Sequence, residues 1–428
     1  MAGLCALVLA LQGARVRDAE LERLLAEEVS GWQRSRALPE PGALAALLRE
    51  AEELDAPLLF QDLGNLGHAL AQAGRADEGR ALVRWSGEQA QAVGALATRS
   101  WSLEWLGQDA WVRGTLDEAL ALLTDAAQCD AERGAAEDEA RHRADVARLL
   151  LTLGRHQQAL AEIQRAEESA ARSTSDHAAR LAAEVHASLL YDLGRHRQAL
   201  ALCDRHAPLD AREPVRDESW VRLDLLAASI LADVGRLETA ASYARRAREL
   251  ALDPRVRQLA PLLHLEAELT LGLLLGDLGR FEEGLALLDE AAREFARLGD
   301  ARGGAWAEKN RGFVLLAAGR AVEAAVPLQH AWQAGHELGV PFLEALGALG
   351  TAEALDEAGA DEARIEQGLA VAEQLGRELG DRQIRWRVEA LRGRRALERG
   401  DATAALDLLR RAVAAVETWR RRLAASPP

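Results

Sequence analysis

The stretch Leu274–Ala292, LLGDLGRFEEGLALLDEAA, holds one copy of the pattern that decides the fold. Its Gly279 belongs to a series of nine glycines that return every 40 to 44 residues: Gly74, Gly114, Gly154, Gly194, Gly235, Gly279, Gly319, Gly359 and Gly400. A fixed period of this size is typical of stacked repeats, in which each repeat packs only on its neighbours. We therefore expect function to lie on an extended surface rather than in one central pocket.

Small residues flank each of these marker glycines at fixed distances. Gly or Ala stands seven residues before the marker in all nine copies, and a small residue stands five residues after it in eight. Small side chains let two helix backbones approach, and the marker glycine supplies the left-handed backbone that ends the first helix. The intervening segments are rich in Ala, Leu, Glu and Arg, and none alternates with the period of a strand. The sequence predicts an all-α solenoid of about nine to ten antiparallel helix pairs.

Three further segments, Asn65–Val83, Trp105–Leu123 and Leu189–Cys203, repeat this spacing of a small residue, Leu, Gly and Ala. They resemble the tetratricopeptide repeat family, and the resemblance runs from about residue 59 to about residue 423. The period exceeds the usual ~34 residues of that family, and the closing proline is mostly missing. Because of its longer period, the chain is similar to the long-period repeats of bacterial signalling and regulatory proteins. The resemblance implies a right-handed superhelix that binds proteins or peptides, and it leaves the partner open.

Prolines interrupt the array twice, in Arg205–Asp217 and in Leu252–Pro261. Because proline ends helices, we expect either a change of superhelical direction between residues 205 and 262 or ordinary long loops. The predicted organisation is degenerate capping helices over 1–56, repeats one to four over 57–205, a proline-interrupted junction with repeat five over 206–262, repeats six to nine over 263–423, and a tail over 424–428.

The composition limits the kinds of partner. The chain has 52 Lys and Arg against 68 Asp and Glu, a formal net charge of −16, and this balance disfavours nucleic acid. The longest apolar run, Met1–Leu11, is shorter than the roughly 17 residues of a membrane span. Three scattered cysteines are typical of a reducing compartment. We expect a cytoplasmic protein without a nucleic-acid or membrane partner, and the oligomeric state stays open.

Sequence motifs for catalysis are missing. Lys309 is the only lysine, so the chain has neither a phosphate-binding loop that ends in lysine nor a kinase-type lysine. His196, Cys203 and His206 lie close together in the sequence, but a zinc site would need a further ligand. We therefore predict a protein that is not an enzyme and that holds no metal or cofactor.

The resemblance places ligands in a concave groove lined by the first helix of each pair. Groove positions then lie thirteen, ten, six and three residues before the marker glycine, and the ninth-before position contacts the ligand backbone. On this basis the groove residues are Asn65, Trp101, Glu104, Gln108, Trp111, Arg141, Arg148, Tyr191, Arg222, Trp306, Lys309, Asn310 and Phe313.

Two sets of these residues have alternative interpretations. Asn65 and Asn310 share the ninth-before position, where the resemblance implies that the amide holds a peptide group. Trp101 and Trp306 share the thirteenth-before position, and ten Trp against five Phe suit a binding surface. The alternative for the two tryptophans is that they pack against the preceding repeat.

Three arginines suggest an acidic ligand. Arg141, Arg148 and Arg222 fall on the expected groove of an otherwise acidic chain. They form either a basic strip that accepts acidic side chains or a C-terminal carboxylate, or ion pairs with Glu104, Glu184 and Asp145.

These observations favour a non-enzymatic adaptor that binds a protein or peptide in its groove. A second hypothesis is a sensor or recognition arm of a bacterial signalling system, whose output is a caspase-like protease, a cyclase or a kinase. A third is a peptide-responsive regulator, although residues 1–56 do not look like a DNA-binding helix-turn-helix. An α-helical toroid enzyme has the least support, because no catalytic groups cluster in the sequence.

Overall fold

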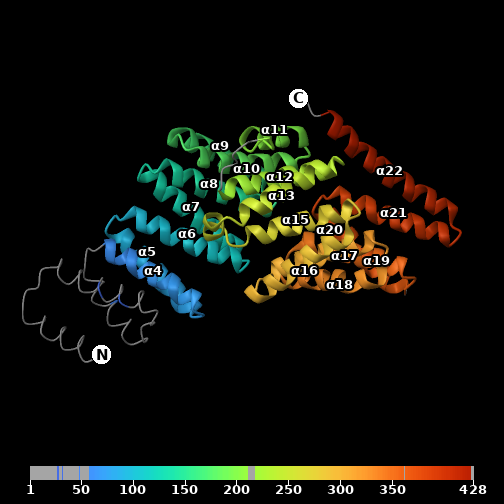
Figure 1. Ribbon diagram of the computed structural model, residues 1–428, viewed down its shortest axis with the longest axis horizontal. Coiled ribbons are helices and arrows are strands. Elements are labelled where there is room, and N and C mark those ends of the chain that lie inside the picture. Colours follow the sequence, from blue (N-terminus) through green and yellow to red (C-terminus); the bar gives the residue numbers. More distant parts are fainter. Residues whose placement is uncertain are drawn as a thin grey trace, which may run out of the picture. The chain divides into compact units, whose positions relative to one another are not determined.

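The computed structural model describes residues 57–210, 217–360 and 362–425, together with the isolated residues Glu27, Gly31 and Leu48. All regular structure in these residues is helical (Figure 1). The chain divides into two compact units, the first ending at Ala182 and the second beginning at Ala183. The expected caps over 1–56 and the last three residues of the tail lie outside this part of the chain.

The first unit contains three complete helix pairs. They are α4 (Pro57–Gln72) with α5 (Ala76–Ala92), α6 (Leu96–Val112) with α7 (Leu116–Glu132), and α8 (Ala136–Thr152) with α9 (His156–Ser173). The next helix, α10 (Asp176–Asp192), crosses the boundary between the units. The predicted all-α fold of stacked helix pairs is therefore confirmed in this unit.

The second unit continues the same arrangement from the second half of α10. Its further helices are α11 (His196–His206), α12 (Glu218–Asp233), α13 (Leu237–Ala251), α14 (Pro254–Leu259), α15 (Leu263–Asp277), α16 (Phe281–Leu298), α17 (Ala301–Ala317), α18 (Ala321–Glu337), α19 (Pro341–Glu357), α20 (Glu362–Glu378), α21 (Arg382–Glu398) and α22 (Ala402–Ala425). The short α14 accounts for the longest step in the glycine series. No helix in the described ranges combines the length and apolar character that crossing a bilayer requires.

The marker glycines end the first helices as predicted. All nine have a positive φ, from +66° at Gly359 to +87° at Gly74. At Gly279 the glycine N–H donates to the carbonyl of Gly276, and the next N–H, of Arg280, donates to Leu275. This is the hydrogen-bond pattern of a left-handed helix end, and it satisfies carbonyls that the helix leaves without partners.

The second helices end in a similar way. Gly94, Gly134, Gly299 and Gly339 lie twenty residues after a marker glycine, and each also has a positive φ. Thr174 occupies the same place after Gly154, with φ +57°. A left-handed threonine is unfavourable, so this position shows that the turn geometry, rather than the residue type, is what the repeat maintains.

Close contact between the two helices of a pair depends on the small residues around the marker. A Cβ added to Gly67 would lie 2.8 Å from the carbonyl oxygen of Gly79, and one added to Gly79 would lie 2.5 Å from that of Gly67. Gly272 and Gly284 form the same reciprocal contact around Gly279. Any larger side chain at these positions would push the two backbones apart.

The first helices of the second unit form one curved surface. Successive first helices contact each other, α12 with α15, α15 with α17, α17 with α19 and α19 with α21, whereas the second helices α16, α18 and α20 make no comparable contacts among themselves. Helices on the inner side of a curved stack converge, and those on the outer side diverge. We call the surface formed by α12, α15, α17, α19 and α21 the first-helix wall.

Arg246 holds the proline-interrupted segment after α11. Its guanidinium donates to the carbonyl oxygens of Pro208 at 2.6 Å and Ala207 at 2.9 Å, and binds both carboxylate oxygens of the fully buried Asp224. It also lies over the rings of Trp220 and Tyr243. The part of this segment that the structure describes is therefore fixed to α12 and α13, inside the predicted junction 206–262.

Candidate functional site

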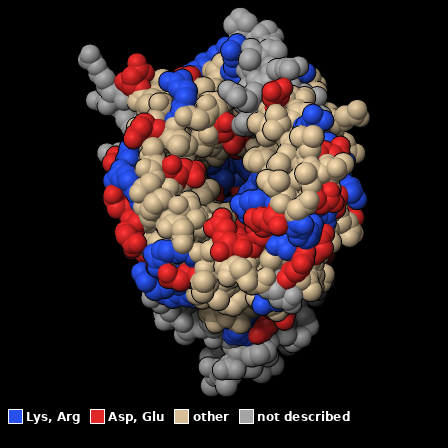
Figure 2. Space-filling view, turned by 90° about the vertical axis from the view of Figure 1, so that its right-hand side faces the viewer, with Lys and Arg blue, Asp and Glu red and all other residues tan. Residues whose placement is uncertain are grey.

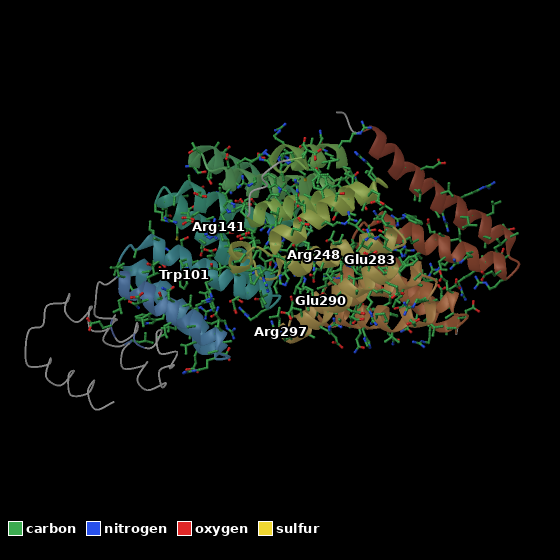
Figure 3. All side chains as sticks on the ribbon, in the orientation of Figure 1. Trp101, Arg141, Arg248, Glu283, Glu290 and Arg297 are labelled. Atoms are coloured by element: carbon green, nitrogen blue, oxygen red, sulfur yellow. The ribbon has the colours of Figure 1, made fainter. Side chains whose placement is uncertain are left out.

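The predicted groove residues fall into two sets, one in each unit. Trp101 in α6 and Arg141 in α8 are labelled in Figure 3 and belong to the first set. The first set is Asn65, Trp101, Glu104, Gln108, Trp111, Arg141 and Arg148, and the second is Tyr191, Arg222, Trp306, Lys309, Asn310 and Phe313. Each set is considered by itself.

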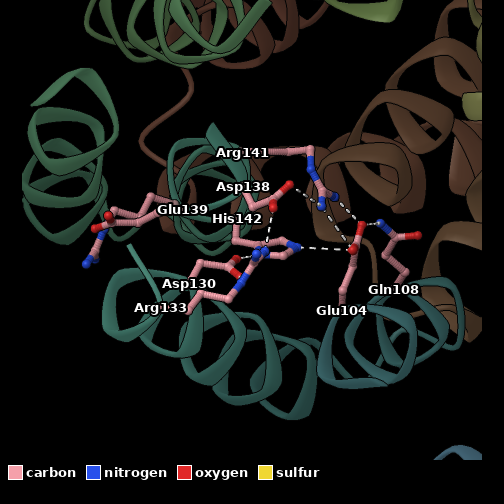
Figure 4. A network of polar contacts seen from close by, with 9 residues as sticks. Glu104, Gln108, Asp130, Arg133, Asp138, Glu139, Arg141 and His142 are labelled. Atoms are coloured by element: carbon pink, nitrogen blue, oxygen red, sulfur yellow. Dashed lines mark hydrogen bonds and ion pairs between the residues drawn. The ribbon is translucent and has the colours of Figure 1, made fainter. Parts of the chain in front are cut away.

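Glu104 is the centre of a polar network in the first unit (Figure 4). The guanidinium of Arg141 donates to both oxygens of Glu104, one of them at 3.0 Å. The Nε2 atom of His142 lies 3.2 Å from Glu104 Oε2, and its Nδ1 lies 2.5 Å from Oδ2 of Asp130. Gln108 donates to Glu104 as well, at 3.3 Å. The network therefore connects α6, α7 and α8.

Burial and pairing set the charges in this network. Burial alone would lower the pKa of His142, but the contacts with Asp130 and Glu104 outweigh it and raise the pKa to about 9. Burial would raise the pKa of Glu104, yet the contacts with His142 and Arg141 lower it to about 2. The ionisable members of this network, Glu104, Asp130, Arg141 and His142, are thus charged near neutral pH and matched by opposite charges, as buried ionic groups require.

The remaining residues of the first set have structural contacts of their own. Trp101 packs on α4, because a Cβ added to Gly64 would lie 2.6 Å from its ring. Trp111 packs against the buried core around Leu123. Arg148 forms an ion pair with Asp145 at 2.5 Å. The exposed Asn65 accepts a long hydrogen bond from Gln61, at 3.4 Å.

In the second unit, Tyr191 belongs to a polar contact rather than to an open surface. Its hydroxyl donates to Oδ2 of Asp233 at 2.7 Å, and its ring meets that of His196 edge-on at 5.3 Å. Burial, followed by the charge of Asp233, raises the pKa of Tyr191 well above its ordinary value. Arg222 is half-buried on α12 and forms no ion pair among the described residues.

Three predicted residues on α17 form a compact cluster, which we call the α17 cluster: Trp306, Lys309 and Phe313. The Nζ atom of Lys309 lies 4.8 Å from the ring centre of Trp306 and 5.8 Å from that of Phe313. Both rings are half-buried, whereas Lys309 is only 8% exposed. Lys309 forms no ion pair within the described ranges, so its charge is offset mainly by the faces of two aromatic rings.

The cluster extends from α17 along the first-helix wall. Trp306 meets Phe342 of α19, at 6.2 Å between ring centres, and Phe342 is 40% exposed. Arg387 of α21 lies 4.9 Å from the ring centre of Phe313 and binds both carboxylate oxygens of Glu353, at 3.1 Å and 2.6 Å. Side chains of α17 and α21 are thus in contact although the helices α18, α19 and α20 lie between them in the sequence. The cluster therefore lies on the inner, converging side of the stack.

Asn310 lies beside the cluster, and among the described residues only the nitrogen of its side-chain amide is hydrogen-bonded. Its Nδ2 donates to the carbonyl oxygen of Leu269 on α15 at 3.2 Å, while its buried Oδ1 has no hydrogen-bond partner among the described residues. An amide offers two donors and an acceptor. The free acceptor therefore carries a desolvation cost that a new donor would relieve.

The electrostatic state of Lys309 is unusual. Burial lowers its pKa to about 7, the positive charge of Arg387 adds to this effect, and the negative charge of Asp277 opposes it. Desolvation by the surrounding chain raises the pKa of Asp277. An amine near half-protonation, between two rings and without a carboxylate partner, is suited to gaining an anionic neighbour.

Sequence reasoning missed several participants. His142 and Asp130 complete the network of the first unit, and Phe342 and Glu353 complete the surroundings of the α17 cluster. Phe342 had a signal, since it follows Pro341 at the start of a first helix. The others had none, because their roles depend on how neighbouring helices are aligned.

Charges on the surface are mostly interspersed. The face drawn in Figure 2 mixes acidic and basic side chains, without a broad area of one sign. Many charged side chains of the described residues form ion pairs within one helix or between neighbouring ones, such as Arg320 with Glu323 and Arg394 with Asp356. Such a surface gives little long-range attraction for a highly charged partner.

No protein-family model and no curated protein matches the chain. Among solved structures it resembles a Rap protein complexed with Competence and Sporulation Factor, with 14% identity, a TM-score of 0.54, and coverage of 86% of this chain and 99% of the other. It also resembles the Rap conjugation gene regulator of the plasmid pLS20 in complex with the Phr* peptide, with 16% identity, a TM-score of 0.50, and coverage of 85% and 96%.

A third similar structure is the STAND protein with a tetratricopeptide repeat sensor from Pyrococcus horikoshii. The identity is 14% and the TM-score 0.50, over 85% of this chain and 54% of that protein. This chain thus spans about half the length of the STAND protein. At such low identity these likenesses show the fold alone, and they confirm that the chain has the tetratricopeptide-type helical-repeat fold.

Proposed function

We propose that this protein binds a peptide or an extended protein segment on the first-helix wall of its second unit, and that it acts as a non-enzymatic adaptor. The observation that carries this proposal is the α17 cluster. It combines half-buried aromatic rings, an amine without a carboxylate partner among the described residues and, beside it, an amide acceptor without a donor. Aromatic residues with a few polar groups are typical of binding hot spots.

The contrast with the first unit supports this location. There the predicted groove residues Glu104, Arg141 and Arg148 are already matched by opposite charges from the same unit. A ligand would have to break these ion pairs, and leaving one buried charge unpaired is costly. A ligand on α17 would instead supply an anionic partner for Lys309 and a donor for Oδ1 of Asn310, and no existing ion pair among the described residues would have to break.

The exposed Phe342 extends the surface that a ligand can cover. It lies at the start of α19, next to Trp306, so two rings from neighbouring first helices form a continuous apolar strip. Rigid aromatic side chains supply contact area at little cost in side-chain entropy. A peptide lying across α17 and α19 would bury this strip.

The solved structures lend support by analogy. One similar Rap structure is a complex with the Phr* peptide, and the likeness covers 85% of this chain and 96% of that one. A peptide-responsive regulator is therefore a second candidate function. The sensor arrangement of the STAND protein favours a third, a recognition arm whose output lies on another polypeptide segment. All three functions need a peptide or protein ligand on the repeat surface, and the net charge of −16 favours a protein ligand over nucleic acid.

The test begins with selection of binding peptides from an unrestricted random display library against the intact protein. The dissociation constant of each selected peptide is then measured for wild type and for three variants. Trp306→Ala and Asn310→Ala remove members of the proposed surface, and Asn65→Ala is the matched control at the same repeat position in the first unit. We expect affinity losses of about tenfold or more for Trp306→Ala.

The expected pattern is weaker binding by Trp306→Ala and Asn310→Ala, with Asn65→Ala unchanged. Equal binding by all four proteins would contradict the location on the second unit. Failure to select any peptide, from a protein with the expected helical circular dichroism, would contradict the function itself.

A further inference from the structure

Lys309 is the one cation of the α17 cluster, and it lies near two aromatic rings and a second basic residue, Arg387. Trp306 stands one helical turn before it and Phe313 one turn after it, so an aromatic ring lies on each side of the amine along the helix. The nearby Arg387 is already bound by Glu353 through two hydrogen bonds. Lys309 therefore offers the uncompensated positive charge of this part of the wall.

We propose that an aspartate or glutamate side chain of the bound peptide pairs with Lys309, that apolar neighbours in the peptide lie on Trp306 and Phe313, and that binding near and above neutral pH draws a proton onto the fraction of Lys309 amine that is neutral. This inference rests on the proposed function and specifies its ligand. It adds a chemical requirement, an acid beside apolar residues, and a dependence of affinity on pH.

The rings on both sides of Lys309 favour an acidic side chain over a C-terminal carboxylate. A peptide that covers Trp306 and Phe313 has to pass over the amine and continue beyond it. The anionic group that the peptide places against Lys309 then belongs to an internal residue of the peptide. A peptide that ended at Lys309 would cover one ring and leave the other in water.

The charged groups around Lys309 come from several helices. On α15 the relevant group is Asp277, which attracts the amine without reaching ion-pair distance, and on α21 it is Arg387, which repels it. Several other charged groups on packed neighbours are engaged with partners: Glu353 with Arg387, Glu344 with His336, Asp289 with Arg311, and Glu323 with Arg320. Asp277 is the described acidic group whose charge acts on the amine, and it therefore competes with a ligand carboxylate.

Protonation of Lys309 follows from these surroundings. Burial and Arg387 lower the pKa of the free protein's Lys309 to about 7, so the amine is partly neutral at physiological pH. A carboxylate placed against it stabilises the ammonium form and raises the pKa. The amine then takes a proton from solvent or buffer, and the resulting ammonium donates to the carboxylate oxygen.

Linkage gives the size and direction of the effect. Between about pH 5 and pH 6 the amine is already protonated while the ligand carboxylate is still ionised, so affinity is nearly independent of pH. Above about pH 7.5 each pH unit weakens binding by a factor approaching tenfold, because the proton has to be acquired from an ever lower concentration. The same coupling means that protonation of Lys309 strengthens peptide binding by the factor by which the bound peptide increases the proton affinity of the amine.

The experiment uses two pools of N-acetylated, C-amidated octapeptides that are random except for a central Leu-Glu-Leu or Leu-Gln-Leu. The two pools differ by a carboxylate and have the same shape and blocked ends. Protein grown with 13Cε-lysine gives a single lysine resonance, because Lys309 is the only lysine. That resonance reports the protonation of Lys309 directly, and calorimetry in two buffers of different ionisation enthalpy counts the protons taken up.

We expect the Glu pool to bind about tenfold or more tightly than the Gln pool at about pH 6, as hydrogen bonds to charged groups predict. The lysine resonance should titrate near pH 7 in the free protein and above pH 9 with the Glu pool. Lys309→Arg, whose charge is fixed, should retain the preference for Glu and lose its pH dependence. Lys309→Met should lose the preference itself, and Asp277→Asn should increase it.

Equal affinity for the two pools, or a lysine resonance that does not move on binding, would overturn this inference and leave peptide binding on the wall intact. A preference that appears only with peptides bearing a free C-terminus would replace the internal acid with a terminal carboxylate. If neither pool binds, and the random library of the preceding section also yields no peptide, the proposed function fails as well.

Discussion

The Nε2 atom of His142 in α8 lies 3.2 Å from Oε2 of Glu104 in α6. The same imidazole meets Asp130 of α7 with its other nitrogen. One buried side chain thus connects three consecutive helices, and the connection is strongest when the imidazole is charged. Stacked repeats are held together mainly by interfaces between neighbours, so a link of this kind strengthens the cooperativity of the first unit.

Stability of the first unit should therefore depend on pH through His142. The folded-state pKa of about 9 exceeds the ordinary value of 6.5, so the stabilisation is complete below about pH 6.5 and is lost as pH rises towards 9. The lost contribution is on the order of 3 kcal/mol. Urea unfolding followed by tryptophan fluorescence, from pH 6 to 9, measures the free energy of unfolding.

The control for this prediction is His142→Asn, which removes the titrating group. We expect the variant to be less stable than wild type near pH 6 and the two curves to converge near pH 9. Curves that stay parallel over this range would mean that the imidazole is not charged in the folded protein. At the acid end, Glu104 contributes stability above about pH 4.5 that falls away as pH approaches its folded pKa of about 2.

Gly347 should not tolerate a side chain. A Cβ at this position would lie 2.7 Å from Cα of Trp332, so α18 and α19 would have to separate. Overpacking of this kind costs about 1–3 kcal/mol, and we expect Gly347→Ala to lower the thermal midpoint of the second unit accordingly. Gly304→Ala is the control, because its Cβ would meet nothing nearer than 4.0 Å and alanine favours a helix. If both variants were equally stable, the close crossing of these helices would be incorrect.

Arg246 should be essential for the proline-interrupted segment. Replacing it with Leu leaves the buried Asp224 without its ion pair, which costs about 3–5 kcal/mol. The carbonyls of Ala207 and Pro208 also lose their donors. We expect Arg246→Leu to make the segment near residue 208 cleavable by limited proteolysis. The double variant Arg246→Leu, Asp224→Leu should recover part of the stability. No recovery would show that the ion pair itself is not what fixes the segment.

The fold was predictable because its determinants are local. Each marker glycine needs a left-handed conformation, and each small residue needs a close backbone, so both requirements appear at fixed spacing in the sequence. The second glycine series, Gly94, Gly134, Gly299 and Gly339, was equally visible at twenty residues from the first and would have given the ends of the second helices.

The candidate site was predictable only in part. Sequence position alone brought Trp306, Lys309 and Phe313 to one face of a helix, and the structure gathers them into one cluster. Sequence position could not reveal that Arg387 binds Glu353 or that Phe342 lies against Trp306. Such contacts depend on the alignment of helices about 30 or more residues apart in the chain. Pairing of charges, which decides where a ligand can bind, is a property of the packed molecule.

Hydrogen–deuterium exchange of the intact protein, with and without a peptide selected from the random library, tests the central claim most directly. We expect that protection on binding concentrates in α17 and α19, with smaller changes in α15 and α21, and that the Trp306→Ala protein shows much less protection at the same peptide concentration. Protection centred on α6 and α8, or on the outer helices α16 and α18, would contradict binding at the first-helix wall.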